Sequence, residues 1–253
     1  MSDFFQTALN LELKQDVSLD DFNAAGFSPI RHAIDELAAG SMRELYIVGG
    51  EGFGKSHLAA AIYRHFNDLG KSVISLTLKE MVGSNYDAFD ALMGLEIFNL
   101  IIIDDLQLLS RSRAWQESVF DLINRVRKQN KQLIFLSTES ARELDVGLLD
   151  LVTRLSLAPT FHLPDNDDVA DRQALIETIL HRRNWRLPEQ IRQYLLDEGP
   201  RNAGDIMRVL DKISPLLTHL TRVQVPKKTI EEAKQIIETQ TLLLEVSDKS
   251  SLD

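Results

Sequence analysis

The sequence predicts an α/β fold in which helices sandwich a parallel sheet, followed by a small all-helical domain. Short apolar runs typical of strands recur along the first two thirds of the chain, and segments with helical spacing separate them. After Pro164 the strand signal disappears and only helical patterns follow. Strands that alternate with helices are typical of a parallel sheet that is covered on both faces.

The expected elements follow from the period at which apolar residues return. Strands are expected at 45–49, 72–77, 100–104 and 132–137, with a weaker fifth at 159–163. Helical spacing is clear at 56–69 and 114–129. The C-terminal part predicts helices at roughly 165–183, 188–196, 202–217 and 228–238.

The domain boundary is expected where LPDND (163–167) supplies a Pro and a run of capping residues. Residues 1–17 precede the first core element, and the last eight residues are polar without periodicity. The expected organisation is a flexible N-terminal segment (1–17), an α/β domain (18–164), a helical domain (165–238) and a C-terminal tail (239–253).

Composition excludes several classes of protein. The chain has 253 residues, and its 44% hydrophobic content is ample for a core. It has no Cys, no signal peptide and no apolar stretch of transmembrane length, so we expect a cytoplasmic protein without membrane contact. A net charge of −10 argues against strong autonomous DNA binding. Six basic residues flank one helical stretch: Arg111, Arg113, Arg125, Arg127, Lys128 and Lys131. Because Glu117 and Asp121 interrupt this series, we interpret it as an ordinary solvated helix face.

A phosphate-binding loop is predicted after the first strand. GGEGFGKSH has the full GxxxxGK[ST] pattern directly between a strand and a helix. Glycines let successive backbone N–H groups converge on phosphate oxygens, Lys55 would bridge the terminal phosphates, and Ser56 would bind a magnesium ion. The alternative is a glycine-rich turn that only reverses the chain. The candidate nucleotide-binding residues are Gly49, Gly50, Glu51, Gly52, Phe53, Gly54, Lys55, Ser56 and His57.

Two carboxylates follow the apolar strand at 100–103. Parallel sheets place ligands at the carboxyl ends of their strands, so Asp104 is the second expected magnesium ligand. Asp105 could orient the attacking water. The alternative for both is a helix N-terminal cap. Ser137 and Thr138 end another strand and could act as a polar sensor, although hydroxyls at strand ends also occur for local reasons.

These motifs together resemble the AAA+ module of the DnaA family over about residues 18–238. The resemblance rests on the GGxGxGKSH loop, IIIDDLQ with Gln107, LSTES, DLVTRL and RLPEQIRQYLLDEGPRN. It implies a bound ADP or ATP with Mg²⁺ in a P-loop AAA+ fold that ends in a helical lid. It also makes Phe22 and Phe27 candidates for contact with the nucleotide base, although either could be a core residue.

The chain ends soon after the expected lid, where DnaA continues into a DNA-binding domain. In length it resembles the DnaA regulatory inactivators. That resemblance implies two partners, the initiator DnaA and the sliding clamp of the replisome, and hydrolysis of the ATP that DnaA carries. A homo-oligomer is also possible.

A clamp-binding peptide of the form QLxLxL begins such inactivators, and here Leu9, Leu11 and Leu13 have the matching spacing. Ala8 stands where Gln is expected. An extended peptide can fill pockets with alternate side chains, but the same pattern also suits an edge strand.

Arg154 in DLVTRL matches the family's arginine finger, which acts across a subunit boundary on the transferring phosphoryl group. The alternative is a surface salt bridge.

The lid departs from the family, because Gly204 stands where an Arg should reach the nucleotide. Arg201 or Arg208 could substitute for it. If neither reaches the nucleotide, the site would bind it tightly but hydrolyse it poorly, so we expect weak intrinsic hydrolysis.

Two other functions remain as hypotheses. One is a helicase loader that cycles ATP and binds single-stranded DNA. The intact phosphate loop and the acidic pair permit this function. The other is an initiator paralogue that only assembles with others of its kind.

Overall fold

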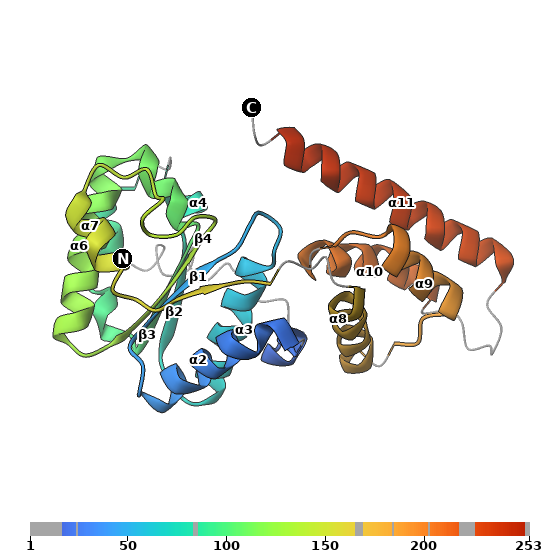
Figure 1. Ribbon diagram of the computed structural model, residues 1–253, viewed down its shortest axis with the longest axis horizontal. Helices are drawn as coiled ribbons and strands as arrows, with labels where there is room; N and C mark the ends of the chain where they lie inside the picture. The colour runs from blue at the N-terminus through green and yellow to red at the C-terminus, as the bar shows by residue number, and fades with distance from the viewer. Residues whose placement is uncertain are drawn as a thin grey trace. The chain divides into compact units, whose positions relative to one another are not determined.

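The computed structural model describes the chain in seven segments: residues 17–23, 25–82, 86–164, 169–183, 185–201, 203–217 and 226–250. The chain forms two compact units (Figure 1). Of the described residues, the first unit holds 17–22, 26–50 and 55–164. The second holds the helices after residue 165 together with the short segments 23–25 and 51–54.

A five-stranded sheet forms the centre of the first unit, in the order β2-β3-β4-β1-β5. Every neighbouring pair is parallel, which confirms the predicted fold class. The strands are β1 (Glu44–Val48), β2 (Val73–Thr77), β3 (Leu100–Asp104), β4 (Gln132–Ser137) and β5 (Thr160–His162). β3 and β4 are buried along their whole length, which explains why their sequences read as continuous apolar runs.

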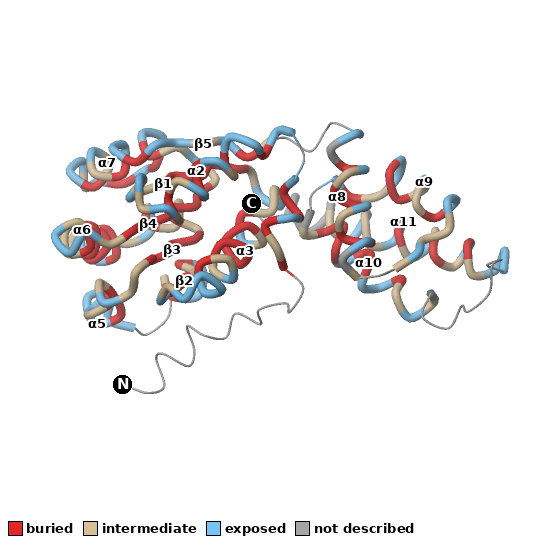
Figure 2. Tube along the Cα trace, turned by 90° about the horizontal axis from the view of Figure 1, so that it is seen from below, coloured by how far each residue is buried: buried red, intermediate tan, exposed pale blue. Residues whose placement is uncertain are grey.

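Helices cover both faces of this sheet (Figure 2). α2 (Ser28–Ala39) and α3 (Lys55–Asp68) lie on one face, and α5 (Ala88–Leu92), α6 (Arg113–Lys128) and α7 (Leu149–Leu155) lie on the other. The remaining described elements are α4 (Leu78–Met81) and four 3₁₀ turns: η1 (Leu19–Phe22), η2 (Ala25–Phe27), η3 (Leu95–Ile97) and η4 (Leu106–Arg111). All lie in the first unit except Ala25, the first residue of η2. Ile101 and Ile103 of β3 share one core cluster with Val119 and Leu122 of α6.

The second unit is helical in every described element. It consists of α8 (Val169–Arg182), α9 (Glu189–Glu198), α10 (Ala203–Leu217) and α11 (Lys227–Ser250). It has its own apolar core, in which Ile179, Leu195, Leu210 and Ile237 are fully or almost fully buried.

The last helix is much longer than the sequence predicted. The expected helix ended at residue 238 and a tail followed, whereas α11 continues to Ser250. Among the side chains of α11 that the structure describes, Ile237 is the last buried one, and Leu242 and Leu243 are more than half exposed. The apolar period therefore stops where the packing stops, while the helix continues because no Gly or Pro interrupts it.

No helix among the described segments has the length and apolar character needed to cross a membrane.

Candidate functional site

The loop after β1 has the backbone that the phosphate motif requires. Gly52 and Gly54 have φ angles of 75° and 88°, a region that side-chain-bearing residues rarely adopt. Gly49 packs so closely on Leu163 that a Cβ atom there would lie 2.7 Å from Leu163 Cδ1. α3 begins directly after the loop, so the positive end of its dipole lies at the loop.

Lys55 holds its ammonium group at the start of this loop. Its Nζ donates to the carbonyl oxygens of Gly49, at 2.7 Å, and of Gly50, at 2.8 Å. The residue is 7% exposed. A buried cation at the start of the loop is placed to meet an anion that enters the loop.

The loop and the acidic strand end meet through one hydrogen bond. Ser56 Oγ donates to Asp104 Oδ2 at 2.6 Å, although the two residues are 48 positions apart. Asp104 is 2% exposed, and this burial raises the pKa of its carboxyl group, while the hydrogen bond from Ser56 opposes the rise. The two predicted metal ligands are therefore adjacent.

Their chemistry fits a magnesium ion. A hydroxyl and a carboxylate are oxygen ligands, and Mg²⁺ commonly takes one or two protein ligands and keeps water and phosphate for the rest. The described residues contain no group of three or more His, Cys, Asp or Glu side chains that could form an all-protein metal cage. A metal here would depend on phosphate oxygens.

Gln107 connects the other predicted polar residues. Its amide nitrogen donates to Asp105 Oδ1 at 3.2 Å, and its amide oxygen accepts from the Thr138 N–H at 3.3 Å and from Ser137 Oγ at 3.4 Å. Asp105 has a left-handed backbone, φ 60°, and donates its N–H to Asp104 Oδ1. The sequence marked Gln107 only as part of a family motif. Its bridging position depends on β3 and β4 being neighbours.

A buried pair anchors the segment before α2 to the loop helix. His57 Nε2 lies 2.8 Å from Asp21 Oδ2, and the Asp21 side chain is fully buried. Phe22 is 1% exposed and packs against Phe27 and His57, which favours the core alternative for Phe22 over contact with a nucleotide base. The sequence does not single out Asp21, because nothing local distinguishes it from Asp20.

Arg154 lies near the start of β1, far along the strand from the phosphate loop. Its carbonyl oxygen accepts a hydrogen bond of 2.8 Å from Arg127 Nη2, and the same nitrogen donates to Glu44 Oε2 at 2.6 Å. The Arg154 guanidinium lies over the Phe120 ring, 5.9 Å from its centre. No carboxylate pairs with Arg154 in the described residues, so the geometry does not support a surface salt bridge.

Other candidate residues have simpler placements. In the loop, Glu51 is exposed and Phe53 is half-buried. In the second unit, Arg208 is exposed and donates to Asp205 Oδ1 at 2.8 Å within α10. Leu9, Leu11 and Leu13 lie outside the described residues.

A parallel sheet in this order, with a phosphate loop after β1 and paired acids after β3, defines a P-loop domain of the AAA+ class. Residues 23–158, more than half of the chain, match the family described as the bacterial DnaA ATPase domain. The chain belongs to this family.

Solved structures agree on the fold. Domain III of the Thermotoga maritima replication initiation protein DnaA matches with a TM-score of 0.74 and 21% identity, over 89% of this chain and 97% of that one. DnaA from Aquifex aeolicus, bound to AMPPCP, matches with a TM-score of 0.64 and 20% identity, over 88% and 80%. DnaI matches with a TM-score of 0.51 and 19% identity, over 58% and 91%.

Proposed function

We propose that this chain is a nucleotide-bound regulator of replication initiation that makes DnaA hydrolyse its ATP, in the manner of the DnaA regulatory inactivator Hda. In this proposal Arg154 acts on a nucleotide held by DnaA, and the sliding clamp is the second partner. The observation that carries it is the position of Arg154 at the sheet edge opposite its own phosphate loop.

The distance along β1 supports action on a partner's nucleotide. Arg127 joins the Arg154 carbonyl to Glu44, the first residue of β1, whereas the loop follows Val48, its last residue. Four steps at roughly 3.3 Å each separate the two ends by about 13 Å. Arg154 is therefore badly placed for its own phosphates, because its backbone lies at the far end of β1 and its guanidinium is held over Phe120, in the middle of α6. It is better placed to face a neighbouring molecule, as an arginine finger must.

The loop supplies the resident nucleotide site of the proposal. Lys55 and the residues from Gly49 to Gly54 would bind the phosphates of ADP or ATP, and Ser56 and Asp104 would hold Mg²⁺. The ion would neutralise phosphate charge. Two DnaA structures that resemble this chain contain the nucleotide analogue AMPPCP. Arg208 is the proposed lid contact, and the absence of an Arg at Gly204 supports slow intrinsic turnover.

The first prediction concerns Arg154. We expect Arg154→Ala to reduce stimulation of DnaA-bound ATP hydrolysis by roughly a thousandfold, because the transferring phosphoryl group loses a positive charge. The measurement is release of phosphate from ATP-loaded DnaA in the presence of clamp-loaded DNA. Arg142→Ala is the matched control, since Arg142 is exposed and makes no hydrogen bond or ion pair within the described residues. Full stimulation by the Arg154 variant would refute the proposed role.

The second prediction concerns the clamp. We propose that Leu9, Leu11 and Leu13 bind it, because alternate apolar side chains of an extended peptide can enter pockets. Deletion of residues 1–14 should abolish clamp association in a pull-down and leave nucleotide affinity unchanged. A triple substitution of the three leucines by Ser should have the same effect. Clamp binding that survives both changes would remove this peptide from the proposal.

A second candidate function is an ATP-cycling helicase loader. The bridge that Gln107 makes between Asp105 and the end of β4 favours it, since this network could orient an attacking water. The two functions differ in turnover by the isolated protein. Vigorous ATP hydrolysis without DnaA would support the loader, whereas basal hydrolysis that rises only when DnaA is added would support the regulator.

A further inference from the structure

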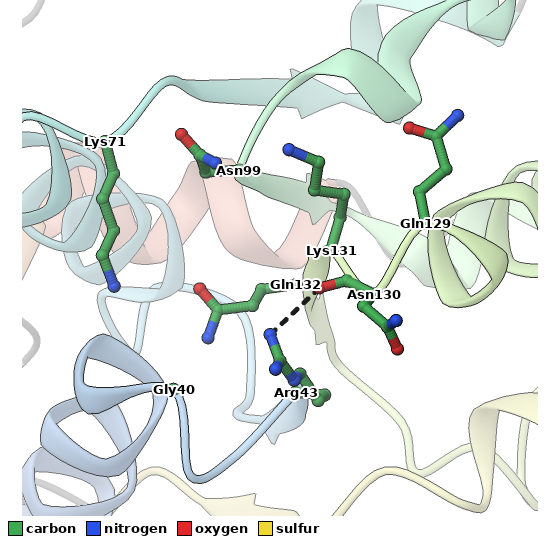
Figure 3. Close-up of a pocket in the computed structure, with 8 residues that line it drawn as sticks. All are labelled: Gly40, Arg43, Lys71, Asn99, Gln129, Asn130, Lys131 and Gln132. Carbon is green, nitrogen blue, oxygen red and sulfur yellow. Dashed lines mark hydrogen bonds between the residues drawn. The ribbon is translucent and has the colours of Figure 1, made fainter.

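A polar pocket lies at the edge of the sheet where the strands begin, opposite the edge that carries the phosphate loop (Figure 3). We call it the amino-edge pocket. Its volume is about 290 Å³, and all of its lining residues belong to the first unit. Its polar lining includes Arg43, Lys71, Asn99, Asn130, Lys131 and Gln132.

The topology gathers these residues. Arg43 directly precedes β1, Asn99 directly precedes β3, and Lys131 directly precedes β4. Lys71 lies two positions before β2. Because all the strands are parallel and paired in register, their first residues meet at one edge, and so do the side chains just before them.

The pocket is positively charged, although the chain as a whole is acidic. Its lining contains three cationic side chains and no carboxylate. Arg43 Nη1 donates to the Asn130 carbonyl oxygen at 3.0 Å, and Lys71 Nζ donates to the Ala38 carbonyl oxygen. The Lys131 ammonium group makes no hydrogen bond or ion pair with any residue that the structure describes, although its backbone N–H donates to the Val126 carbonyl oxygen.

The basic residues of α6 behave differently. Arg113 pairs with Glu117 at 2.8 Å, Arg125 pairs with Glu96 at 3.1 Å, and Arg127 pairs with Glu44. Those pairs account for three of the six residues of the basic stretch, whereas Lys131, which the sequence assigned to the same solvated helix face, lines the pocket instead. The three cations of the pocket lack such carboxylate partners among the described residues.

The competing explanation is that these cations only neutralise helix ends. α2, α3 and α6 all end at this edge, and each C-terminus carries about half a negative charge. Their total is roughly −1.5 charges, against three full positive charges on Arg43, Lys71 and Lys131. The helix ends therefore offset about half of the cationic charge, and the surplus favours an anion from outside the unit.

Asn99 places a neutral hydrogen-bond donor beside these cations. Its Oδ1 accepts from the Ser72 N–H at 2.9 Å and from Ser72 Oγ at 2.8 Å. These two donors fix the orientation of the Asn99 amide group. Its nitrogen, Nδ2, is left as a hydrogen-bond donor for which no described residue is the acceptor. Figure 3 shows Asn99 and Lys131 as neighbouring members of the lining. A half-buried amide donor beside an unpaired ammonium suits a phosphate oxygen.

We propose that the amino-edge pocket binds a phosphate-bearing anion, as a second site that is separate from the phosphate loop. Lys131 and Arg43 supply charge, and Asn99 supplies a directed hydrogen bond. The phosphate can belong to a free polyphosphate or to the backbone of a nucleic-acid strand. This proposal does not depend on the regulatory function, because the pocket shares no residue with the loop or with Arg154.

The test uses the full chain with Lys55→Ala, which disables the phosphate loop and leaves the pocket as the remaining site. Inorganic pyrophosphate is titrated by calorimetry, and a fluorescent oligothymidine is titrated by anisotropy at the same salt concentration. Lys131→Ala and Asn99→Asp are then added separately. Asn99→Asp keeps the oxygen that accepts from Ser72, so the fold is preserved, while it removes the donor and adds a negative charge.

We expect at least one of the two probes to bind saturably to the Lys55→Ala protein, and each added substitution to weaken that binding tenfold or more. Lys128→Ala is the matched control, since Lys128 is exposed, three positions from Lys131 and outside the pocket. Binding of pyrophosphate identifies a small polyphosphate as the source, and binding of oligothymidine alone identifies a nucleic-acid backbone. Absence of binding, or equal binding by the Lys131, Asn99 and Lys128 variants, would overturn the proposal.

Discussion

Gln107 shows how one side chain can join two strand ends. It donates to the Asp105 carboxylate and accepts from the backbone of Thr138. An apolar residue of similar size would leave the Thr138 N–H and the Asp105 carboxylate without these bonds. A polar group that loses its hydrogen-bond partner away from water destabilises the folded state. Gln107 is therefore expected to affect stability as well as chemistry.

We predict that Gln107→Leu lowers the free energy of unfolding of the first unit by about 1–2 kcal/mol. Trp115, which is buried in α6, reports on this unit by fluorescence in urea when Trp185 is replaced by Phe. Gln107→Glu keeps the acceptor for Thr138 but places a negative charge beside Asp105, so it should also destabilise. Equal midpoints for both variants and the parent would contradict the bridging role.

Ser56 and Asp104 show how a candidate metal site forms from distant parts of the chain. The sequence identified both residues by motif, and the 2.6 Å contact confirms that their side chains meet. It could not predict that Asp104 would be almost fully buried with a raised pKa. That property depends on the helices packed around the end of β3.

At the scale of elements, glycines mark the places where backbones approach closely. At Gly199, after α9, a Cβ atom would lie 2.2 Å from the Leu195 carbonyl oxygen, which is backbone and cannot move aside cheaply. At Gly147 a Cβ atom would meet only Arg113 Nη1, at an ordinary 3.6 Å. The same substitution should therefore have opposite consequences at the two positions.

We predict that Gly199→Ala destabilises the second unit by about 1–3 kcal/mol, because the end of α9 must shift. Gly147→Ala should be neutral or stabilise by up to about 1 kcal/mol, since it restricts the unfolded chain without a clash. Each variant is followed in urea by the Trp of its own unit, Trp185 for Gly199 and Trp115 for Gly147. A tolerated Gly199→Ala would show that α9 ends differently.

The elements of the first unit were easier to predict than those around them. β3 and β4 have the expected bounds, because a buried parallel strand is one unbroken apolar run. The short turns between β2 and β3 were missed, since elements as short as α4 and η3 carry too few residues for a period to appear. α11 was predicted too short, because its apolar period ends before the helix does.

At the scale of the whole molecule, each unit buries its own set of apolar residues. The second unit places Ile176 and Ile179 of α8 in one cluster with residues of α9, α10 and α11. A unit with an independent core is expected to fold by itself. We therefore propose that the functional boundary between the α/β domain and the helical lid lies at residues 164 and 165, as the sequence analysis expected.

This boundary predicts that a fragment of residues 165–253 unfolds cooperatively, with the urea midpoint that Trp185 reports in the full chain. A control fragment that begins at residue 185 lacks α8 and its four buried core residues, Leu175, Ile176, Ile179 and Leu180. It should lose the transition. A fragment 165–253 without a cooperative transition would move the boundary.

The sequence by itself determined the fold class, the phosphate-loop motif and the acidic strand end, because each is a local pattern of period or spacing. It also identified Arg154, but only through a family motif. Tertiary structure decided which residues meet: Ser56 with Asp104, Gln107 with the end of β4, and His57 with Asp21. It also gathered the residues before four strands into the amino-edge pocket. The Gln107 bridge and the pocket depend on the order β2-β3-β4-β1-β5, and strand order is a long-range property that no local period encodes.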